Sequence, residues 1–268
     1  MKIPFYPILC AGLLALIINS CASNPYAATN RIYKKQTKEL TKTIRQLPVP
    51  VPGQDWAGAV NFGLRKPNYV IIHHTAQAST GQTLKTFTML KTQVSAHYVI
   101  GKDGKVFHML NDYFRAWHAG ASKWGNSSDI NSSSIGIELD NNGIELFSEI
   151  QIGSLINVLA ELKKNYAIPT ANFIGHSDIA PGRKVDPNAN FPWQGLSEKG
   201  FGLWPDAVLD SVPENFNPQE ALRIIGYDTS NMDFATQSFK LHFIQNDPSP
   251  MLTEFDKQVL YNLYKKYL

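Results

Sequence analysis

The sequence predicts an α/β fold in which a central β-sheet is flanked by helices and followed by a small three-helix domain. Between residues 69 and 175, short runs rich in branched and aromatic side chains alternate with helical patterns, which is typical of a sheet covered by helices. The 268 residues are 43% hydrophobic and 11% aromatic, so the chain is too apolar for a disordered protein. Its length is sufficient for one large domain or two smaller ones.

Five strands and two helices are expected in the larger domain. The strand candidates are the runs 69–72, 96–100, 106–109, 135–139 and 173–174. Apolar residues recur at helical spacing from Leu84 to Val94, and a stronger amphipathic pattern runs from Ile152 to Tyr166. Pro169 closes the second pattern, because proline cannot continue a helix.

The composition shifts after Pro213 and predicts a helical end to the chain. Helical patterns cover 218–225, 234–243 and 253–267, joined by turn-rich pieces. Thr253 is expected to cap the last of these helices. We therefore expect a larger domain at 53–213 and a small separate domain at 214–268.

The first twenty residues have the pattern of a secretory signal peptide. Lys2 is the only charged residue before Arg31, and the apolar run 8–18 that follows it has eleven residues. A membrane-spanning helix needs about 20 apolar residues, so this run is too short to cross a bilayer. A positive start, a short apolar centre and a small residue before a cleavage site are typical of a secretory signal, predicted here as 1–20.

Cys21 ends a string, Ile18-Asn19-Ser20-Cys21, that resembles the lipobox of bacterial lipoproteins. The resemblance implies that the signal is removed and that Cys21 is acylated, which anchors the protein to a membrane. Ala22 rather than an aspartate follows the cysteine, and by similarity with such proteins this favours the outer membrane, with the protein facing the periplasm. A plain signal peptide and an uncleaved anchor are the alternatives.

Residues 21–52 are expected to be a tether. They are polar and rich in lysine, and the stretch 22–46 allows a weak helix. Pro48, Pro50 and Pro52 favour extended backbone. The folded domain is therefore expected to begin near Gly53.

Charge and cysteine content exclude several classes of protein. The net charge of +3, without basic blocks, gives no reason to expect a nucleic-acid partner. The two cysteines, Cys10 and Cys21, cannot supply a disulfide framework or a cysteine-rich zinc site. Any metal ion must therefore be held by histidines and carboxylates.

Three residues form a candidate metal-ligand set. His73 follows a strand that reads as buried, His176 follows the run 173–174, and Asp186 lies ten residues later in a loop. Two imidazoles and a carboxylate are a common ligand set for catalytic zinc, with one position left for water. Their spacing alone does not decide the matter, because a histidine at a strand end is more often hydrogen-bonded than metal-bound.

Five strings in one order resemble the type 2 N-acetylmuramoyl-L-alanine amidases, above all the zinc-dependent outer-membrane lipoprotein amidases of Gram-negative bacteria. The strings are Ile71–Ala76, Ser95–Tyr98, Trp117–Gly120, Ser134–Glu138 and Gly175–Lys184. The resemblance covers roughly residues 50 to 206 and implies the type 2 amidase fold, with a central mixed β-sheet. Residues 214–268 resemble, more weakly, a three-helix peptidoglycan-binding-like domain.

The resemblance implies an activity and a role for each site residue. The activity is zinc-dependent hydrolysis of the amide bond between N-acetylmuramic or anhydro-N-acetylmuramic acid and L-alanine, in peptidoglycan and its fragments. His73, His176 and Asp186 become the Zn²⁺ ligands, Glu138 the acid/base residue and Lys184 the cationic helper. Bound zinc polarises an amide carbonyl, a carboxylate can take and return a proton, and an ammonium can stabilise an oxyanion. Without the motifs, Glu138 would be read as an ion-pair partner and Lys184 as a solvated charge.

The remaining histidines and tryptophans are assigned to other positions. His74 is not expected to share an ion with His73, because adjacent residues on a strand point to opposite faces. The others are expected next to the ligands or in the groove (His97 and His118), as a groove lining or as core (Trp117 and Trp124), and as structural residues (His108 and His242).

Two functions outside enzymology are the alternatives. A non-catalytic peptidoglycan-recognition protein would keep the fold but lack a zinc ligand, whereas all three ligand positions are occupied here. A wall-anchoring lipoprotein fits the tether and the C-terminal helices, and this role is compatible with catalysis. The motifs do not separate an enzyme of intact wall from one of soluble anhydro-muropeptides, and no obligate protein partner is predicted.

Overall fold

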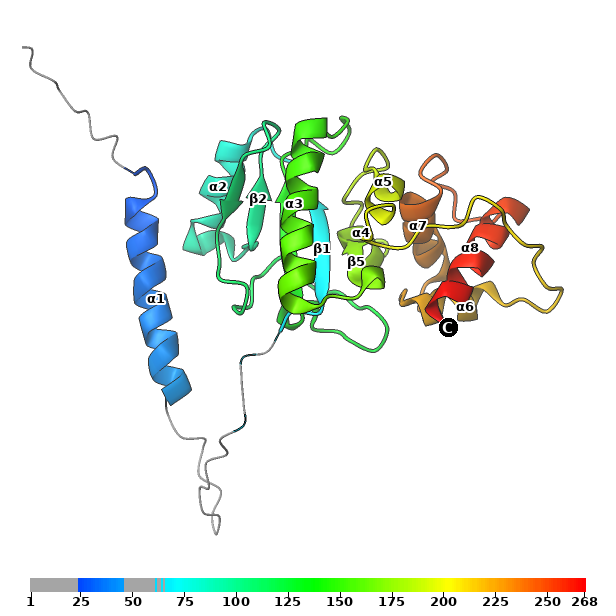
Figure 1. Ribbon diagram of the computed structural model, residues 1–268, viewed down its shortest axis with the longest axis horizontal. Helices are drawn as coiled ribbons and strands as arrows, with labels where there is room; N and C mark the ends of the chain where they lie inside the picture. The colour runs from blue at the N-terminus through cyan, green and yellow to red at the C-terminus, as the bar shows by residue number, and fades with distance from the viewer. Residues whose placement is uncertain (1–23, 46–60, 62–63, 65) are drawn as a thin grey trace, which may run out of the picture. The chain divides into compact units, whose positions relative to one another are not determined.

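The computed structural model describes residues 24–45, 61, 64 and 66–268 (Figure 1). The chain divides into two units, Met1–Ala59 and Val60–Leu268. The predicted signal peptide, the lipidated Cys21 and the start of the folded domain near Gly53 lie outside the described residues and stay predictions. Among the described helices, none has the length and apolar character needed to cross a membrane.

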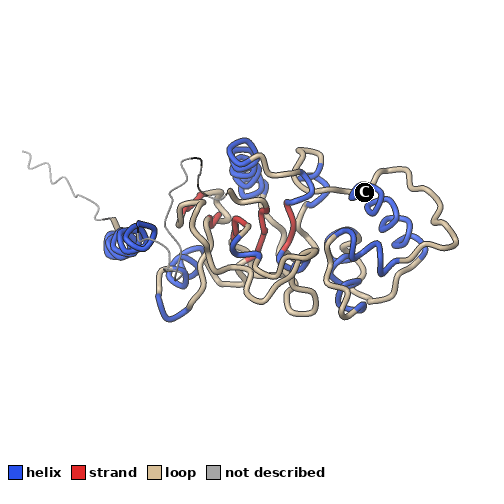
Figure 2. Tube along the Cα trace, turned by 90° about the horizontal axis from the view of Figure 1, so that it is seen from below, coloured by secondary structure: helices blue, strands red, loops and turns tan. Residues whose placement is uncertain are grey.

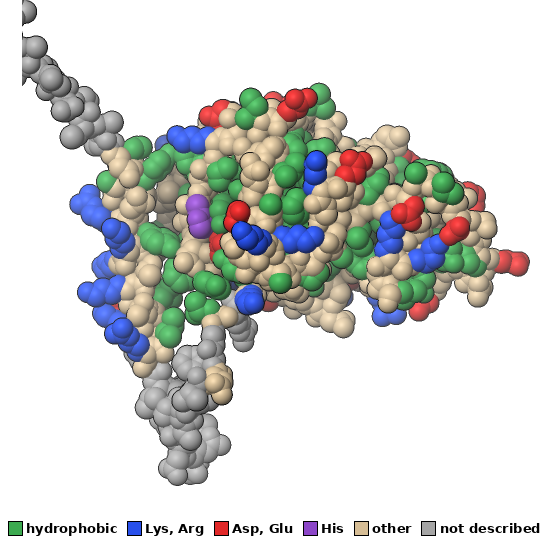
Figure 3. Space-filling view, in the orientation of Figure 1, with side chains coloured by type: hydrophobic (Ala, Val, Ile, Leu, Met, Phe, Trp, Pro, Cys, Tyr) green, Lys and Arg blue, Asp and Glu red, His purple; other side chains and the backbone are tan. Residues whose placement is uncertain are grey.

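The described part of the first unit is a single helix, α1 (Ala27–Arg45). None of its residues is buried, and basic side chains follow one another along it (Figure 3). Only Glu39 opposes these positive charges within the helix. The predicted tether allowed for a helix here, and the structure contains one.

The second unit is built on a five-stranded sheet (Figures 1 and 2). Its elements are β1 (Tyr69–His74), α2 (Thr80–Phe87), η1 (Leu90–Thr92), β2 (Tyr98–Ile100), β3 (Val106–His108), η2 (Ile130–Ser132), β4 (Ser134–Leu139), α3 (Glu149–Tyr166), η3 (Thr170–Asn172), β5 (Phe173–Gly175), α4 (His176–Ile179), α5 (Trp193–Ser197), α6 (Pro218–Ile225), α7 (Met232–Phe243) and α8 (Glu254–Tyr267). The strand order is β3-β2-β4-β1-β5, in which β3 is antiparallel to β2 and the other pairs are parallel. The predicted central mixed sheet flanked by helices is confirmed.

The two faces of the sheet are covered by different parts of the chain, because alternate residues of a strand point to opposite sides. Val70 and Ile72 of β1 pack in one cluster with Ile135 and Ile137 of β4 and with the apolar side of α3. Ile71, between Val70 and Ile72, belongs instead to the cluster that contains the C-terminal helices. One face of β1 therefore lies under α3 (Figure 1), and the other face is the one that holds the candidate site.

The expected helix between Leu84 and Val94 is shorter in the structure. α2 ends at Phe87, and the chain continues as the short 3-10 helix η1. The Thr88 hydroxyl donates to the carbonyls of the preceding turn, and Gln93 has a left-handed backbone with φ of 52°. These two residues end the helical path, which leaves Leu90 and Val94 exposed rather than in the core.

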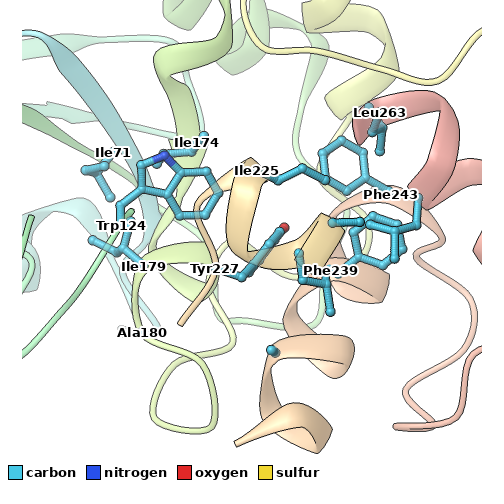
Figure 4. Packing of buried hydrophobic residues seen from close by; sticks show 14 of the residues in the cluster. Ile71, Trp124, Ile174, Ile179, Ala180, Ile225, Tyr227, Phe239, Phe243 and Leu263 are labelled. Atoms are coloured by element: carbon cyan, nitrogen blue, oxygen red, sulfur yellow. The ribbon is translucent and has the colours of Figure 1, made fainter. Parts of the chain in front are cut away.

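The three C-terminal helices are present and share a core with the sheet (Figure 4). Thr253 caps α8 by accepting a hydrogen bond from the backbone N–H of Asp256, which confirms its predicted role. One apolar cluster contains Ile71 and Ile174 of the sheet together with side chains of α6, α7 and α8. The boundary between 213 and 214 stays a prediction, but the helices are joined to the sheet in one compact unit. About fifty residues can bury little apolar surface alone, and the sheet supplies the rest.

Candidate active site

β1 and β4 place a histidine and a glutamate side by side. The two strands are parallel neighbours, and their register aligns His73 with Glu138 near their carboxyl ends. Aligned residues on adjacent strands point to the same face of a sheet. Both side chains are buried on the face opposite α3.

The second histidine lies at the turn from β5 into α4. The loop that follows brings Asp186 back to the same place ten residues later. Gly175 ends β5 and His176 begins α4. The backbone N–H of Ser177 donates to the Asp186 carbonyl at 2.8 Å, which ties the two ends of the loop together. A Cβ on Gly175 would lie 2.9 Å from the ring of Pro187, so a glycine allows this close passage.

His73, His176 and Asp186 converge on one point. The Nδ1 atoms of the two histidines lie 2.9 Å apart. Oδ2 of Asp186 is 3.1 Å from Nδ1 of His73 and 3.0 Å from Nδ1 of His176. All three side chains are buried, and together they form a group that could hold a metal ion.

The hydrogen bonds around this group show that its inner atoms are acceptors. Nε2–H of His176 donates to the Ala119 carbonyl at 3.0 Å, which leaves Nδ1 of a neutral imidazole without a proton. Burial and the neighbouring His176 lower the pKa of His73 to about 4, so this ring is also neutral near pH 7. Asp186 adds a carboxylate oxygen, which also only accepts.

The three acceptors fit a zinc ion. Zinc ligand atoms at about 2.0–2.2 Å in a tetrahedron are roughly 3.3–3.5 Å apart. The observed separations of 2.9 to 3.1 Å are slightly shorter, so a small outward movement would place the atoms at zinc distance. Without a cation, lone pairs and a carboxylate would face one another at hydrogen-bond distance with no proton to share, which is unfavourable in a buried site.

Glu138 lies beside the ligands without being one of them. Its Oε1 is 4.0 Å from Nδ1 of His73. Burial and the charge of Asp186 raise the pKa of Glu138 to about 8, against the opposing effect of Lys184. A carboxyl with a pKa near the working pH can both accept and release a proton.

Lys184 is half-buried in the loop that precedes Asp186. Its charge lowers the pKa of both His73 and Glu138, so the ammonium lies close enough to act on the site electrostatically. Its backbone N–H donates to the Ala180 carbonyl at 3.1 Å, whereas its ammonium has no hydrogen bond or ion pair with any described residue. The ammonium is therefore available for an anionic group.

The histidines outside the ligand set lie where the structure gives them other partners. His74 points to the opposite face from His73, where its Nδ1 accepts from the Asn188 backbone N–H at 3.1 Å. His97 accepts from the N–H of Gly136 through Nδ1 and contacts the Phe114 carbonyl through Nε2. Neither ring reaches the three convergent atoms.

His118, His108 and His242 have three different surroundings. Nδ1 of His118 lies 3.0 Å from Nε2 of His73, so His118 is directly behind a ligand. His108 stacks on Tyr98, with ring centroids 4.4 Å apart, and is half exposed. His242 is buried in α7 with its Nδ1 2.7 Å from Oδ2 of Asp178.

The two candidate groove tryptophans differ in exposure. Trp124 is buried in the cluster shared with the C-terminal helices, which places it in the core (Figure 4). Trp117 has 52% of its surface exposed and directly precedes His118. Only Trp117 is thus accessible to a ligand.

Sequence reasoning gave no role to several residues that hold the site. Oδ1 of Asn131 accepts from the backbone N–H groups of His118 and Ala119, at 3.1 and 2.9 Å. Arg183 donates to the Ala119 carbonyl at 2.6 Å, the same oxygen that His176 uses. Asn131 has no local signal in the sequence, since its contacts are with a loop a dozen residues away.

The chain is similar to known cell-wall amidases in both sequence and structure. A family model described as N-acetylmuramoyl-L-alanine amidase matches residues 63–189. N-acetylmuramoyl-L-alanine amidase AmiD of Escherichia coli is 37% identical over 155 residues, which are 52% of this chain and 55% of that protein. 1,6-anhydro-N-acetylmuramyl-L-alanine amidase AmpD of Haemophilus influenzae is 37% identical over 103 residues, 38% of this chain and 56% of that protein. The chain thus spans about half the length of these relatives.

Two solved structures resemble the fold over most of the chain. One is E. coli AmiD in complex with the substrate anhydro-N-acetylmuramic acid-L-Ala-D-gamma-Glu-L-Lys, with a TM-score of 0.68 and 27% identity. It covers 82% of this chain and 97% of that one. The other is AmpDh3 of Pseudomonas aeruginosa, with a TM-score of 0.70, 26% identity, and coverage of 83% and 99%.

Proposed function

We propose that this chain hydrolyses the amide bond between N-acetylmuramic or anhydro-N-acetylmuramic acid and L-alanine, as its match to the family model of N-acetylmuramoyl-L-alanine amidases over residues 63–189 suggests. The observation that carries the proposal is the convergence of His73, His176 and Asp186 with Glu138 4.0 Å from His73. The similar AmiD structure holds an anhydro-muropeptide, which supports peptidoglycan and its fragments as the substrate class.

Zinc is the proposed cofactor, held by His73, His176 and Asp186. When bound, it would polarise the scissile carbonyl and acidify a water molecule, which is the chemistry that amide hydrolysis needs. The two imidazoles and the carboxylate leave a position open for water and substrate. A binding-only protein has no need of three converging acceptors, so this ligand set favours catalysis over the non-catalytic alternative.

Glu138 is the proposed acid/base residue. It would take a proton from the attacking water and deliver it to the nitrogen of L-alanine as the amide bond breaks. Its buried position next to the ligands gives it a pKa of about 8, close to neutrality, which suits both halves of this transfer.

Lys184 is the proposed partner of the negative charge that develops on the carbonyl oxygen. Its ammonium is unpaired among the described residues. Its positive charge lowers the pKa of His73 and of Glu138, so it lies near both the ligands and the acid/base residue. A fixed positive charge at a developing oxyanion lowers the barrier, because the charge is needed only in the transition state.

We also propose that Cys21 carries a lipid anchor to the outer membrane, so that the protein faces the periplasm. The string Ile18–Cys21 and the exposed, polar helix α1 support this placement. Labelling of cells with a radioactive fatty acid should mark the wild-type protein and leave Cys21→Ser unlabelled. Equal labelling of both proteins would refute the anchor. Wall binding by residues 214–268 stays a prediction.

The reaction is tested by mass spectrometry of the products from purified sacculi and from soluble anhydro-muropeptides. Wild-type protein loaded with zinc should release peptides that begin with L-alanine. Glu138→Gln should lower kcat by about 100-fold or more while zinc content stays the same, since a general acid/base contributes factors of that size.

The matched control is Glu161→Gln, which removes an exposed glutamate from α3. It should have the activity of the wild type. Cleavage of a different bond would refute the proposed reaction, and full activity of Glu138→Gln would refute the role of that residue.

A further inference from the structure

His118 and Ser134 form a chain of contacts behind the ligand His73. Nε2 of His73 lies 3.0 Å from Nδ1 of His118. Nε2 of His118 lies 3.2 Å from Oγ of Ser134, and the Ser134 hydroxyl lies 2.7 Å from the Ile130 carbonyl. All the side chains in this chain of contacts are buried.

The direction of every hydrogen bond follows from the last one. A carbonyl oxygen only accepts, so the single hydroxyl hydrogen of Ser134 is donated to Ile130. Oγ of Ser134 must then accept from Nε2–H of His118. A neutral imidazole has one N–H, so Nδ1 of His118 accepts from Nε2–H of His73, and Nδ1 of His73 is left with its lone pair.

We infer that His118 and Ser134 are positioning residues that fix the proton of His73 on Nε2 and so keep Nδ1 free to bind the metal ion. This inference rests on the metal site of the proposed function. It concerns which nitrogen of His73 carries the proton, and both residues act through His73.

The two ligand histidines differ in how much support they need. His176 donates to the carbonyl of Ala119, which can only accept and therefore fixes its tautomer directly. His73 faces another imidazole, which can donate or accept. Only a further partner for His118 removes this ambiguity, and the pair of Ser134 and the Ile130 carbonyl does so.

The surrounding chain is built to hold the His118 ring. A Cβ on Gly136 would lie 2.4 Å from that ring, so the glycine of β4 makes room for it. Asn131 accepts from the backbone N–H of His118, which fixes its position along the loop. One face of β4 presents Ser134, Gly136 and Glu138, because these residues alternate along the strand. The same face therefore holds the hydrogen-bond partner of His118, the glycine that makes room for its ring, and the acid/base residue. We call the chain of contacts from Ser134 through His118 to His73 the relay.

A wrong tautomer at His73 would have a direct cost. A proton on Nδ1 would occupy the position where the metal ion binds. Partners that orient metal-bound histidines typically contribute 10- to 100-fold to metal affinity. We therefore expect zinc affinity, measured by competition with a chelator, to fall by about 10- to 100-fold in His118→Leu.

Three further variants separate hydrogen bonding from packing. In His118→Asn the amide oxygen can take the place of Nδ1 as acceptor, so it should recover part of the affinity lost in His118→Leu. Ser134→Ala should weaken zinc binding by a smaller factor, because it only frees the tautomer of His118. Ser133→Ala is the matched control, since its hydroxyl also donates to the Ile130 carbonyl, at 3.3 Å, but does not contact His118.

Two spectroscopic readouts report the ligand geometry and the proton directly. The visible absorption of the cobalt-substituted protein should change in His118→Leu and Ser134→Ala and stay unchanged in Ser133→Ala. ¹⁵N NMR of the zinc-loaded wild type with labelled histidine should show His118 as the Nε2–H tautomer, and this measurement needs no variant.

Several results would overturn the relay. These are an Nδ1–H tautomer of His118, wild-type zinc affinity in His118→Leu, or equal losses in His118→Leu and His118→Asn. A wild-type protein that bound no zinc would refute the metal site and the relay together. A zinc-loaded wild type that cleaved no muropeptide would refute the proposed function alone, because the relay is measured by affinity and spectra.

Discussion

Two buried clusters of histidine and aspartate each include one residue of α4. They differ in whether hydrogen-bond donors face the acceptors. The first contains His176 with His73 and Asp186, and the second contains Asp178 with His242 and Tyr227. In the first cluster the inner atoms are all acceptors, separated by 2.9 to 3.1 Å. Such a set is unfavourable when buried alone and is stabilised by a cation.

In the second cluster the Asp178 carboxylate is matched with donors, although the buried Nε2 of His242 has no hydrogen-bond partner among the described residues. Asp178 accepts from the Gly175 backbone N–H, from Nδ1–H of His242 and from the Tyr227 hydroxyl, each at 2.7 Å. A carboxylate with three donors is satisfied in a buried position. The His242 ring is also stacked on Trp193, with centroids 3.9 Å apart. This cluster needs no ion.

The comparison shows that residue type does not separate a metal site from a structural site. Both clusters are made of imidazole and carboxylate groups, and only the direction of the hydrogen bonds differs. The second cluster also connects the C-terminal helices with the site. Asp178 lies two residues after the ligand His176 and binds His242 of α7, so α7 helps to hold the ligand loop.

The largest expected effect is on metal binding in the first cluster. Asp186→Asn removes the charged ligand, and we expect zinc affinity to fall by more than about 100-fold, beyond the loss typical of residues behind a ligand. In the metal-free protein the new amide N–H group can donate to an imidazole, so the free energy of unfolding should stay equal or rise. Calorimetric zinc titration and urea unfolding in chelator measure the two effects.

Asp233→Asn, an exposed aspartate in the first turn of α7, is the control for both measurements and should match the wild type. Zinc affinity of wild-type strength in Asp186→Asn would remove the distinction between the two clusters. A large loss of metal-free stability in that variant would also contradict it.

The second expected effect is a loss of stability with little change in zinc affinity, the opposite of the effect of Asp186→Asn. Asp178→Asn replaces a carboxylate that three donors share, and we expect it to lower the free energy of unfolding by about 3 kcal/mol, with or without zinc. The zinc affinity of the folded fraction should change far less than in Asp186→Asn. Urea unfolding at matched zinc concentrations measures this, again with Asp233→Asn as control. A loss below about 0.5 kcal/mol, the range of ordinary surface changes, would show that the second cluster is not a structural anchor.

The strands and the positions of the ligand histidines were predictable because their signals are local. His73 lies at the end of one buried run and His176 directly follows another, so both side chains are placed at the same end of parallel strands. Their convergence was not predictable from spacing, because His73 and His176 are 103 residues apart. The resemblance to a family supplied that information.

The hydrogen bonds that distinguish the two clusters left no signal in the sequence. Asp178 reads as an ordinary acidic residue in a loop, and its partner Tyr227 is 49 residues away. Helical patterns show which side of each C-terminal helix is apolar, but they do not show what that side packs against. The shared core with Ile71 therefore became visible only in three dimensions.

The smallest expected effect is a pH dependence that comes from a buried histidine beside the first cluster. Burial lowers the pKa of His97 below the ordinary 6.5, although its contact with the Phe114 carbonyl opposes this. Below pH 6.5 the unfolded chain therefore takes up a proton that the folded protein does not, and stability falls until the lowered pKa is reached.

His97→Asn keeps an acceptor for the Gly136 N–H and cannot titrate. Its free energy of unfolding should fall less between pH 7.5 and 5 than that of the wild type, by about 1 kcal/mol or less, since each unit of pKa difference corresponds to about 1.4 kcal/mol. His108→Asn should have the opposite effect. A hydrogen bond with Asp112 raises the pKa of His108, so the wild type gains stability from this residue on acidification. The variant lacks that gain, and its free energy of unfolding should fall more between pH 7.5 and 5 than that of the wild type. Urea unfolding of the metal-free proteins at several pH values measures the slopes, and parallel curves for wild type and His97→Asn would show that His97 is not held neutral by the fold.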